Sequence, residues 1–289
     1  MSANDPQYRN PTYHTTDADY VLPNDAVEYD RLEEQAIGLT KMMQKDPPIH
    51  APLENPQKLV DIGCGTGYLT RQLADIYPTA HVYGIDLSPL RIPTSGNVEF
   101  ILGDVRKLIG SDSRLAYESA DFVFSRLLFM GMTDWPSYVR DTVSLVRSGG
   151  WVEMQDLVFE LYLHGSPCSD EWGWMKAIKT AAQEKGMDLQ CGKNIARYME
   201  EAGLEDIVVK EYRMPCGTWL EEQKPETKRI GESTGREYGR IVYYMLPKML
   251  QGKGYTAEQL DVFRESALRD SAGRDGLETI LYVTIGRKP

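Results

Sequence analysis

The chain between residues 57 and 158 alternates short apolar runs with longer segments whose apolar residues recur at helical spacing. Predicted strands cover 58–62, 81–86, 97–102, 120–125 and 151–155. Helices are predicted over 66–77 and 135–146, whereas the stretch between the second and third strands is too short for a full helix and is predicted as mostly loop. Such alternation is typical of a doubly wound, mostly parallel α/β sheet.

The parts of the chain that flank this region follow other patterns. Residues 1–19 are polar and are predicted to form an arm. Asn24 or Asp25 can cap a helix that continues to Met43, and the prolines within 46–52 end it.

The last third of the chain predicts further helices and two more strands. Helices are expected over 170–186 and 193–203, a strand at 207–212, polar helical segments within 217–272 and a final strand at 279–285. A long insertion before the last strand of an open sheet usually builds a lid or a pocket wall.

The most specific local signal is the segment Asp61-Ile-Gly-Cys-Gly-Thr-Gly67 between the first strand and the helix that follows it. Glycines let the backbone approach a ligand closely, and the next helix directs free N–H groups at the same place. A dinucleotide fingerprint requires G-x-G-x-x-G, whereas the spacing here is G-x-G-x-G. This departure bears on which nucleoside cofactor the turn receives.

Two acidic residues follow the next strands. Asp86 ends the second strand, where a carboxylate can accept hydrogen bonds from a ribose diol. Asp104 and Val105 follow the third strand and lie beside the same crevice, where the acid can take an exocyclic amine. The alternatives are a capping role for Asp86 and a simple turn for Asp104.

Composition limits the classes of function. The formal net charge is -11 and the isoelectric point is near 5.0, which argues against a nucleic-acid backbone as the main partner. The four cysteines form no C-x-x-C pair, and with four histidines no zinc constellation stands out. Widely spaced single cysteines suggest reduced thiols inside the cell. No run approaches the roughly 20 apolar residues of a membrane span.

Taken together, these parts resemble the class I S-adenosyl-methionine-dependent methyltransferases. The matching segments are Leu59-Val-Asp-Ile-Gly-Cys-Gly-Thr-Gly67, Gly84-Ile-Asp-Leu-Ser88, Gly103-Asp104-Val105, Asp121-Phe-Val-Phe-Ser125 and Leu145-Val-Arg-Ser-Gly-Gly-Trp-Val-Glu153. They cover roughly residues 57–158 in the order and spacing of the family.

A narrower similarity points to the fungal methyltransferases related to LaeA, the regulator of secondary metabolism. It rests on Tyr20-Val-Leu-Pro-Asn-Asp25 followed by Glu28 and Arg31-Leu32, on Leu87-Ser-Pro89, on Asp134-Trp-Pro136 and on the Gly-Gly-Trp-Val-Glu segment. The insertion at 217–272 is matched only loosely.

The resemblance implies a doubly wound, Rossmann-like methyltransferase sheet of seven strands, the last of them antiparallel. It also implies a division of the chain into 1–56, an N-terminal arm and helix that cover the cofactor, and 57–289, the methyltransferase domain. Helical lid insertions are expected at about 159–203 and 215–277, the second of them between strands six and seven.

The cofactor implied by the resemblance is S-adenosyl-L-methionine. The glycines cradle its methionine part, residues around Asp86 hold the ribose, Asp104 and Val105 flank the adenine, and Tyr20 closes over the cofactor or only anchors the arm. Asp61 can serve the ammonium group, and backbone N–H groups can serve the carboxylate. The predicted cofactor-binding residues are Tyr20, Asp61, Gly63, Cys64, Gly65, Gly67, Asp86, Leu87, Asp104, Val105, Ser125 and Arg126.

The acceptor side of the site is less well defined. Asp156 follows the fifth strand and is the first candidate for a base or acceptor-orienting group, with a paired turn residue as the alternative. His164 is the second candidate, and a structural or merely exposed loop histidine is its alternative. Met130, Trp174 and Tyr243 are predicted to line an apolar acceptor pocket, although residues of these types are also common in ordinary cores.

The resemblance therefore implies a cytoplasmic methyltransferase that acts on a small natural-product acceptor of fungal secondary metabolism, most simply at oxygen, with nitrogen, sulfur and carbon as alternatives. A nuclear, LaeA-like regulatory protein that works through protein partners is one alternative. A protein that keeps the cofactor for a non-methylating task, such as a cyclisation, is another. Neither a nucleic acid nor a membrane is an expected partner, and a homodimer or a regulatory protein partner is left open.

Overall fold

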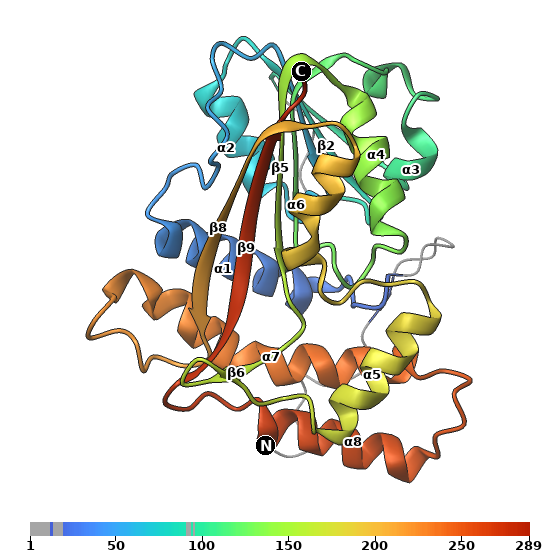
Figure 1. The fold of residues 1–289 in the computed structure, drawn as a ribbon, viewed down its shortest axis with the longest axis vertical. Helices are drawn as coiled ribbons and strands as arrows, with labels where there is room; N and C mark the ends of the chain where they lie inside the picture. Colours follow the sequence, from blue (N-terminus) through green and yellow to red (C-terminus); the bar gives the residue numbers. More distant parts are fainter. Residues whose placement is uncertain (1–11, 14–19, 91–93, 95) are drawn as a thin grey trace.

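The computed structural model describes residues 12–13, 20–90, 94 and 96–289, and within them the chain forms a sheet of nine strands (Figure 1). The strand order is β3-β2-β1-β4-β5-β9-β6-β7, and β8 pairs with β9 outside this path. The strands are β1 (Lys58–Ile62), β2 (His81–Asp86), β3 (Val98–Leu102), β4 (Ala120–Arg126), β5 (Val146–Leu157), β6 (Tyr162–Leu163), β7 (Ser166–Pro167), β8 (Glu205–Pro215) and β9 (Leu277–Arg287). The helices are α1 (Ala26–Met43), α2 (Tyr68–Ile76), α3 (Val105–Leu108), α4 (Trp135–Leu145), α5 (Gly173–Glu184), α6 (Cys191–Glu201), α7 (Lys228–Met249) and α8 (Ala257–Asp270), with short 3-10 turns at Ser113–Leu115 and Pro225–Thr227.

The strand directions confirm the predicted fold class. Strands β1 to β5 run parallel, and β9 runs antiparallel to both β5 and β8. The predicted count of seven strands is wrong, because β6 and β7 form an additional hairpin that pairs with β9 at Leu277 and Glu278. Strands of two residues are too short to show the alternation from which strands are predicted.

The fifth strand also begins earlier than its sequence pattern predicts. β5 starts at Val146, so Gly149 and Gly150 lie inside the strand rather than in a turn before it. A register shift between Ala120 and Phe122 of β4 marks a bulge at this point. Glycines occur at such irregular positions within strands but are also typical of turns, so their presence does not reveal that the strand begins before residue 151.

The two faces of the sheet pack against different helices. In β1, Leu59 packs toward α2, whereas Val60 and Ile62 pack toward α4 and α6. In β4, Phe124 lies on the α2 side and Val123 on the opposite side. Successive side chains of a strand point to opposite faces, so this alternation decides toward which layer each residue at a strand end points.

Four helices gather at the carboxyl ends of the parallel strands, in the lower half of Figure 1. Helices α5, α7 and α8 share an apolar cluster that includes Trp174, Val242 and Met245. Helix α1 packs along α7, and its Leu39 lies in a cluster with Ile230, the end of β5 and the middle of β9. These helices therefore cover the edge of the sheet at which α/β proteins bind ligands.

Carboxylates hold the start of α1 and the segment that follows the helix. Asp25, one of the two predicted caps, accepts a hydrogen bond from Glu28 N at 3.0 Å. Beyond the helix, the fully buried Glu153 of β5 accepts hydrogen bonds from His50 N at 2.6 Å and Ala51 N at 2.9 Å. The sheet thereby sets the position of the helix that covers its carboxyl edge.

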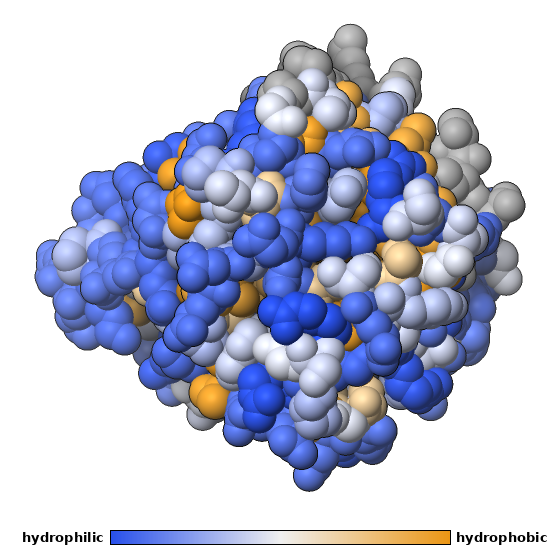
Figure 2. Space-filling model, turned by 90° about the horizontal axis from the view of Figure 1, so that it is seen from above, coloured by the Kyte–Doolittle hydropathy of each residue, from blue (hydrophilic) through white to orange (hydrophobic). Residues whose placement is uncertain are grey.

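Figure 2 shows a face on which hydrophilic residues dominate and apolar ones are scattered. Across the described part of the chain, no helix combines the length and the apolar character that crossing a membrane demands. Most of the predicted arm, at 1–11 and 14–19, and part of the loop after the second strand, at 91–93 and 95, lie outside the described residues.

Candidate functional site

The Gly-rich loop between β1 and α2 is held against β2 by its backbone. Gly63 N and Cys64 N both donate hydrogen bonds to Ile85 O, at 2.8 and 3.0 Å. The three glycines of the loop have φ angles between 55° and 72°, the left-handed region that favours glycine. A Cβ atom at Gly63 would also overlap the side chain of Leu128. The sequence pattern therefore specifies a backbone shape that other residues adopt only with strain.

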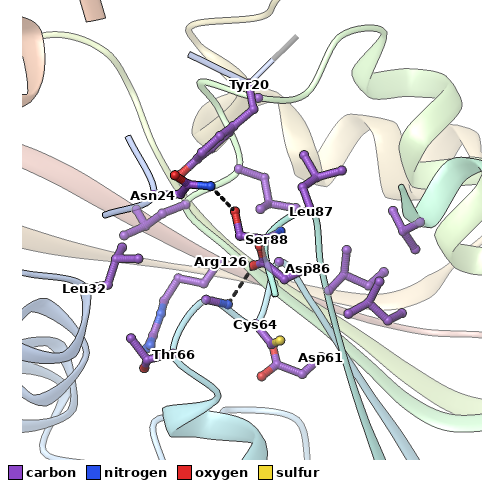
Figure 3. Close-up of a pocket in the computed structure, with 18 of the residues that line it drawn as sticks. Tyr20, Asn24, Leu32, Asp61, Cys64, Thr66, Asp86, Leu87, Ser88 and Arg126 are labelled. Carbon is purple, nitrogen blue, oxygen red and sulfur yellow. Dashed lines mark hydrogen bonds between the residues drawn. The ribbon is translucent and has the colours of Figure 1, made fainter. Parts of the chain in front are cut away.

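A cavity of about 610 Å³ opens over this loop (Figure 3). Sites for small molecules commonly have volumes of roughly 300–1,000 Å³. The lining comes from the Gly-rich loop, the end of β2, the start of α3, the loop after β4, and α1 with the segment before it. It includes the predicted residues Tyr20, Asp61, Gly63, Cys64, Gly65, Asp86, Leu87, Asp104, Val105 and Arg126.

Asp86 joins the Gly-rich loop to the loop after β2. Its Oδ2 accepts from Gly65 N and its Oδ1 accepts from Ser88 N, both at 2.9 Å. Asn24, from the segment before α1, donates to Ser88 Oγ at 3.3 Å (Figure 3). A carboxylate oxygen can accept more than one hydrogen bond, so these contacts are compatible with a diol that binds to Asp86 from the cavity.

Another part of the cavity is formed by the start of α3. Asp104 caps this short helix by accepting from Arg106 N at 3.0 Å, and Val105 is buried beside it. The Arg106 side chain is turned to its neighbours, with Nε 3.4 Å from Asp141 Oδ2 and Nη1 donating to Thr133 O at 3.3 Å. An acid and an apolar side chain thus stand side by side, as an adenine with its exocyclic amine requires.

Asp61 and Arg126 stand at the ends of adjacent parallel strands and point to the α2 side of the sheet. Asp61 accepts from Thr70 Oγ1 of α2 at 2.6 Å, and burial raises the pKa of its carboxyl to about 6. Burial lowers the pKa of Arg126, while the charge of Asp61 opposes that effect. The buried Nη1 of Arg126 has no hydrogen-bond partner among the described residues.

The segment before α1 closes the cavity from above. The Tyr20 ring packs on Gly131 of the loop after β4, where an added Cβ would lie 2.6 Å from Tyr20 Cδ2. Burial is the main cause of the raised pKa of Tyr20. On α1, Glu28 lines the cavity and accepts two hydrogen bonds of 2.7 Å from Arg31, and both side chains are almost completely buried.

Sequence reasoning missed most of the lining that α1 contributes. Leu32, Ala36 and Leu39 face the cavity, although their spacing predicted only that one side of the helix is buried. Thr66 of the Gly-rich loop was also missed, although its place between two of the predicted glycines could have identified it. Spacing shows that a helix face is covered but not whether a core or a cavity lies under it.

Two predicted cofactor residues lie outside the lining formed by the described part of the chain. Ser125 is buried in β4 and shares the parity of Val123, so it points toward α4 rather than toward α2. Gly67 is the N-terminal cap of α2, and its φ of 72° lets the backbone turn from the Gly-rich loop into the helix. Their binding roles stay predictions.

The two predicted catalytic residues also lie outside the lining of the described residues. Asp156 is 1% exposed, with Oδ2 accepting from Leu128 N at 2.8 Å and Oδ1 from Leu157 N at 2.9 Å. His164 is exposed in the β6–β7 turn, where its backbone N–H donates to Gly276 O at 2.9 Å. Their catalytic roles stay predictions, and the contacts of Asp156 favour positioning of the loop after β4.

The predicted acceptor residues pack elsewhere in the described structure. Met130 and Trp174 are buried in the cluster of α5, α7 and α8, and Trp174 Nε1 donates to Asp270 Oδ2 at 3.2 Å. The ring of Tyr243 on α7 lies 4.7 Å from the guanidinium carbon of Arg264. These contacts are those of a helical core, so the acceptor role of all three stays a prediction.

The fold and the cavity define a nucleoside-binding α/β protein, and comparison with known proteins identifies its class. A family model described as a methyltransferase domain matches residues 38–209, more than half of the chain. The chain therefore belongs to the methyltransferase-domain family. It is a class I S-adenosyl-methionine-dependent methyltransferase that resembles the LaeA-like group.

Two fungal proteins are similar to this chain in sequence, and one archaeal chain is similar to it in fold. "Methyltransferase pytC" of Aspergillus terreus is 28% identical over 286 residues, covering 96% of this chain and 85% of that protein. "Secondary metabolism regulator laeA" of Monascus pilosus is 28% identical over 217 residues, covering 72% of this chain and only 57% of that protein. A solved structure, "Complex between the Haloferax volcanii Trm112 methyltransferase activator and the putative methyltransferase", contains a chain of the same fold. The TM-score is 0.50 at 14% sequence identity, and the match covers 91% of this chain and 95% of that chain.

Proposed function

We propose that the enzyme transfers the methyl group of S-adenosyl-L-methionine to an oxygen atom of a small, largely apolar acceptor. The observation that carries the proposal is the cavity wall formed by α1. Leu32, Ala36 and Leu39 line it together with Leu127 and Leu128 of the loop after β4. Aliphatic side chains beside the cofactor site favour an apolar acceptor, and a cavity covered by a helix favours a small molecule over a protein.

The charge of this wall supports a neutral acceptor. Glu28 is the acidic residue of α1 that lines the cavity, and the two hydrogen bonds from Arg31 neutralise it. A cationic amine would be better served by an unpaired carboxylate. A hydroxyl group can be held by a hydrogen bond, for which Gln35 of the same helix lines the cavity. The proton that the oxygen loses when the methyl group is transferred is released to the solvent.

The proposed roles of the cofactor residues follow from their geometry. When bound, S-adenosyl-L-methionine supplies an electrophilic methyl group on a sulfonium. The Gly-rich loop receives the methionine part, Asp86 the ribose, and Asp104 with Val105 the adenine. The protein aligns the acceptor with the methyl group and excludes water, for which Tyr20 and α1 provide the cover. In this proposal, residues 1–56 cover the cofactor of a domain that spans 57–289.

A role in fungal secondary metabolism is proposed from the named relatives. The pytC relative is named as a methyltransferase and not as a regulator, and the similarity covers nearly the whole chain and 85% of that protein, which supports an enzyme of metabolism as the first candidate. The LaeA relative supports the second candidate, a regulatory methyltransferase that acts through protein partners. A biosynthetic enzyme is expected in the cytoplasm and a regulatory methyltransferase in the nucleus. Imaging of the tagged protein in the cell would therefore help to distinguish the two candidates.

The test is a reaction with methyl-labelled S-adenosyl-methionine and matched pairs of acceptors. Each pair consists of a hydroxylated aromatic metabolite and its methoxy counterpart, in which the oxygen is already blocked. We expect label in the hydroxylated member only, with one S-adenosylhomocysteine formed per methyl transferred. Preferred labelling of amines would refute oxygen as the target. A changed product without an added methyl would support a cyclase instead.

A further inference from the structure

We propose that Glu28, held in place by Arg31, accepts a hydrogen bond from the hydroxyl group that is methylated, and that this contact selects acceptors with a free hydroxyl group. The inference rests on the proposed methylation of an oxygen atom and names the residue that would recognise that oxygen. Both residues belong to α1, outside the Gly-rich loop and the strand ends that are proposed to receive the cofactor.

Glu28 is a carboxylate for which the proposed binding of the cofactor has no use. Among the described residues that line the cavity, the carboxylates are Glu28, Asp61, Asp86 and Asp104. The last three stand at or just after the carboxyl ends of β1, β2 and β3, where the proposal gives them the ammonium group, the ribose and the adenine. Glu28 instead belongs to the aliphatic wall of α1, so it faces the space left for the acceptor.

The position of Glu28 along α1 brings it close to the cofactor site. Burial raises the pKa of Tyr20, and the charges of Glu28 and Asp86 raise it further. Both carboxylates therefore lie near the phenol that covers the cavity. Because Asp86 is proposed to receive the ribose, an acceptor that is held by Glu28 would lie beside the cofactor.

Arg31 fixes the orientation of the Glu28 carboxylate. Its Nε donates to Oε2 and its Nη2 to Oε1, both at 2.7 Å, and its Nη1 donates to Gln35 Oε1 at 3.3 Å. This fork sets the plane of the carboxylate, and each oxygen can accept a further hydrogen bond from the cavity.

The burial of this ion pair indicates a role in binding. The side chains of Glu28 and Arg31 are only 10% and 8% exposed. Removing two charges from water costs more free energy than packing apolar side chains of similar size in their place. An ion pair in an otherwise aliphatic wall is therefore better explained by recognition of a ligand than by stabilisation of the helix.

The contact also accounts for the hydroxyl proton. With its O–H directed at Glu28, the acceptor can turn a lone pair of the oxygen toward the methyl group. The O–CH3 bond forms as the CH3–S bond breaks, the sulfonium becomes a thioether, and the proton passes to Glu28 and then to the solvent. The oxygen becomes strongly acidic once it is methylated, so a carboxylate that is paired with Arg31 is still basic enough to take the proton.

A matched pair of acceptors tests the recognition of the hydroxyl group. The probes are the hydroxylated aromatic metabolite that the wild type labels fastest and its methoxy counterpart. Isothermal titration calorimetry of the full chain, saturated with S-adenosylhomocysteine, should show that the hydroxylated member binds about 10 to 100 times more tightly, the range for a hydrogen bond to a charged group. A wild-type ratio near 1 would overturn the proposal. If no hydroxylated metabolite is labelled at all, the proposed function is refuted instead.

A double variant then assigns the effect to the ion pair. Glu28→Leu combined with Arg31→Met replaces the pair by apolar side chains and leaves no buried charge alone. The affinity ratio should fall to about 1 and turnover should fall with it, while the affinity for S-adenosylhomocysteine stays unchanged. The matched control is Glu34→Leu combined with Arg229→Met, which removes an ion pair of 2.8 Å between α1 and α7 outside the described lining of the cavity. The control should keep the wild-type ratio and turnover.

Two results would contradict the role of Glu28. The double variant could keep the wild-type ratio, or it could lose affinity for S-adenosylhomocysteine, which would make Glu28 a cofactor residue. Glu28→Gln provides a second measurement that does not depend on the folding of the double variant, because the amide oxygen still accepts from Arg31. A neutral oxygen accepts more weakly than a carboxylate, so its ratio should lie between 1 and the wild-type value. An unchanged ratio in Glu28→Gln would also reject the proposal.

Discussion

Replacement of Asp156 by asparagine should change how the stability of the protein depends on pH. Burial raises the pKa of this carboxyl from 3.8 to about 7, against the effect of the backbone N–H groups that it accepts from. An acid with a raised pKa binds its proton more tightly in the folded state, so its stabilising contribution is present at low pH and lost as the pH rises through 7. The rise in pKa on folding corresponds to a change of about 4 kcal/mol in the free energy of unfolding, and about 3 kcal/mol of this change occurs between pH 5 and pH 8.

The measurement is urea-induced unfolding at several pH values from 5 to 8, followed by tryptophan fluorescence. Asparagine is neutral throughout, so the wild type should lose about 3 kcal/mol relative to Asp156→Asn as the pH rises across this range. Asp75→Asn, at an exposed site on α2, serves as the control and should give a constant difference. Parallel curves for the wild type and Asp156→Asn would refute the argument from burial.

The same variant separates positioning from catalysis. Asp156 accepts from Leu128 N, and the Leu128 side chain packs over Gly63 in the Gly-rich loop. If Asp156 positions this loop, Asp156→Asn should weaken S-adenosylhomocysteine binding and methyl transfer together. A base would instead lose turnover at unchanged cofactor affinity, and that result would restore the catalytic prediction.

Three further predictions concern the cofactor site. The affinity for S-adenosylhomocysteine should fall about tenfold for each pH unit below pH 6, because Asp61 must be ionised to attract the ammonium group and the pKa of Asp61 is about 6. Calorimetry on Asp61→Asn should show weak binding that no longer varies over this pH range. Gly63→Ala should lower the free energy of unfolding in urea by more than Gly186→Ala does. Both glycines have a positive φ, but an added Cβ would overlap Leu128 at Gly63 and meets nothing within 4 Å at Gly186. An equal loss of about 1–2 kcal/mol for the two variants would mean that only backbone strain matters. Gly131→Leu should displace the Tyr20 ring and raise the dissociation constant of S-adenosylhomocysteine with little change in melting temperature, and an unaltered dissociation constant would remove Tyr20 from the cofactor cover.

The features of the site that are set by residues adjacent in the chain can be predicted from the sequence. The glycine spacing dictates a loop with positive φ angles, and the acids at the strand ends reach the cavity because parallel strands share one carboxyl edge. The alternation of side chains between the two faces of a strand can also be read from the sequence, and it predicts which residues at a strand end share a face. In β4 and β5 it separates Arg126, which points to the α2 side, from Ser125 and Asp156, which point to the other.

What the sequence by itself determined about this protein is therefore the donor half of the site: the α/β class, the Gly-rich loop and the acids that follow the first three strands. Only the tertiary structure decided the acceptor half. Helical spacing marks Leu32 and Trp174 equally as members of a covered helix face, but Leu32 faces the cavity whereas Trp174 packs inside the helical cluster. An amphipathic pattern records that a face is removed from water, and what covers that face depends on contacts between segments far apart in the chain.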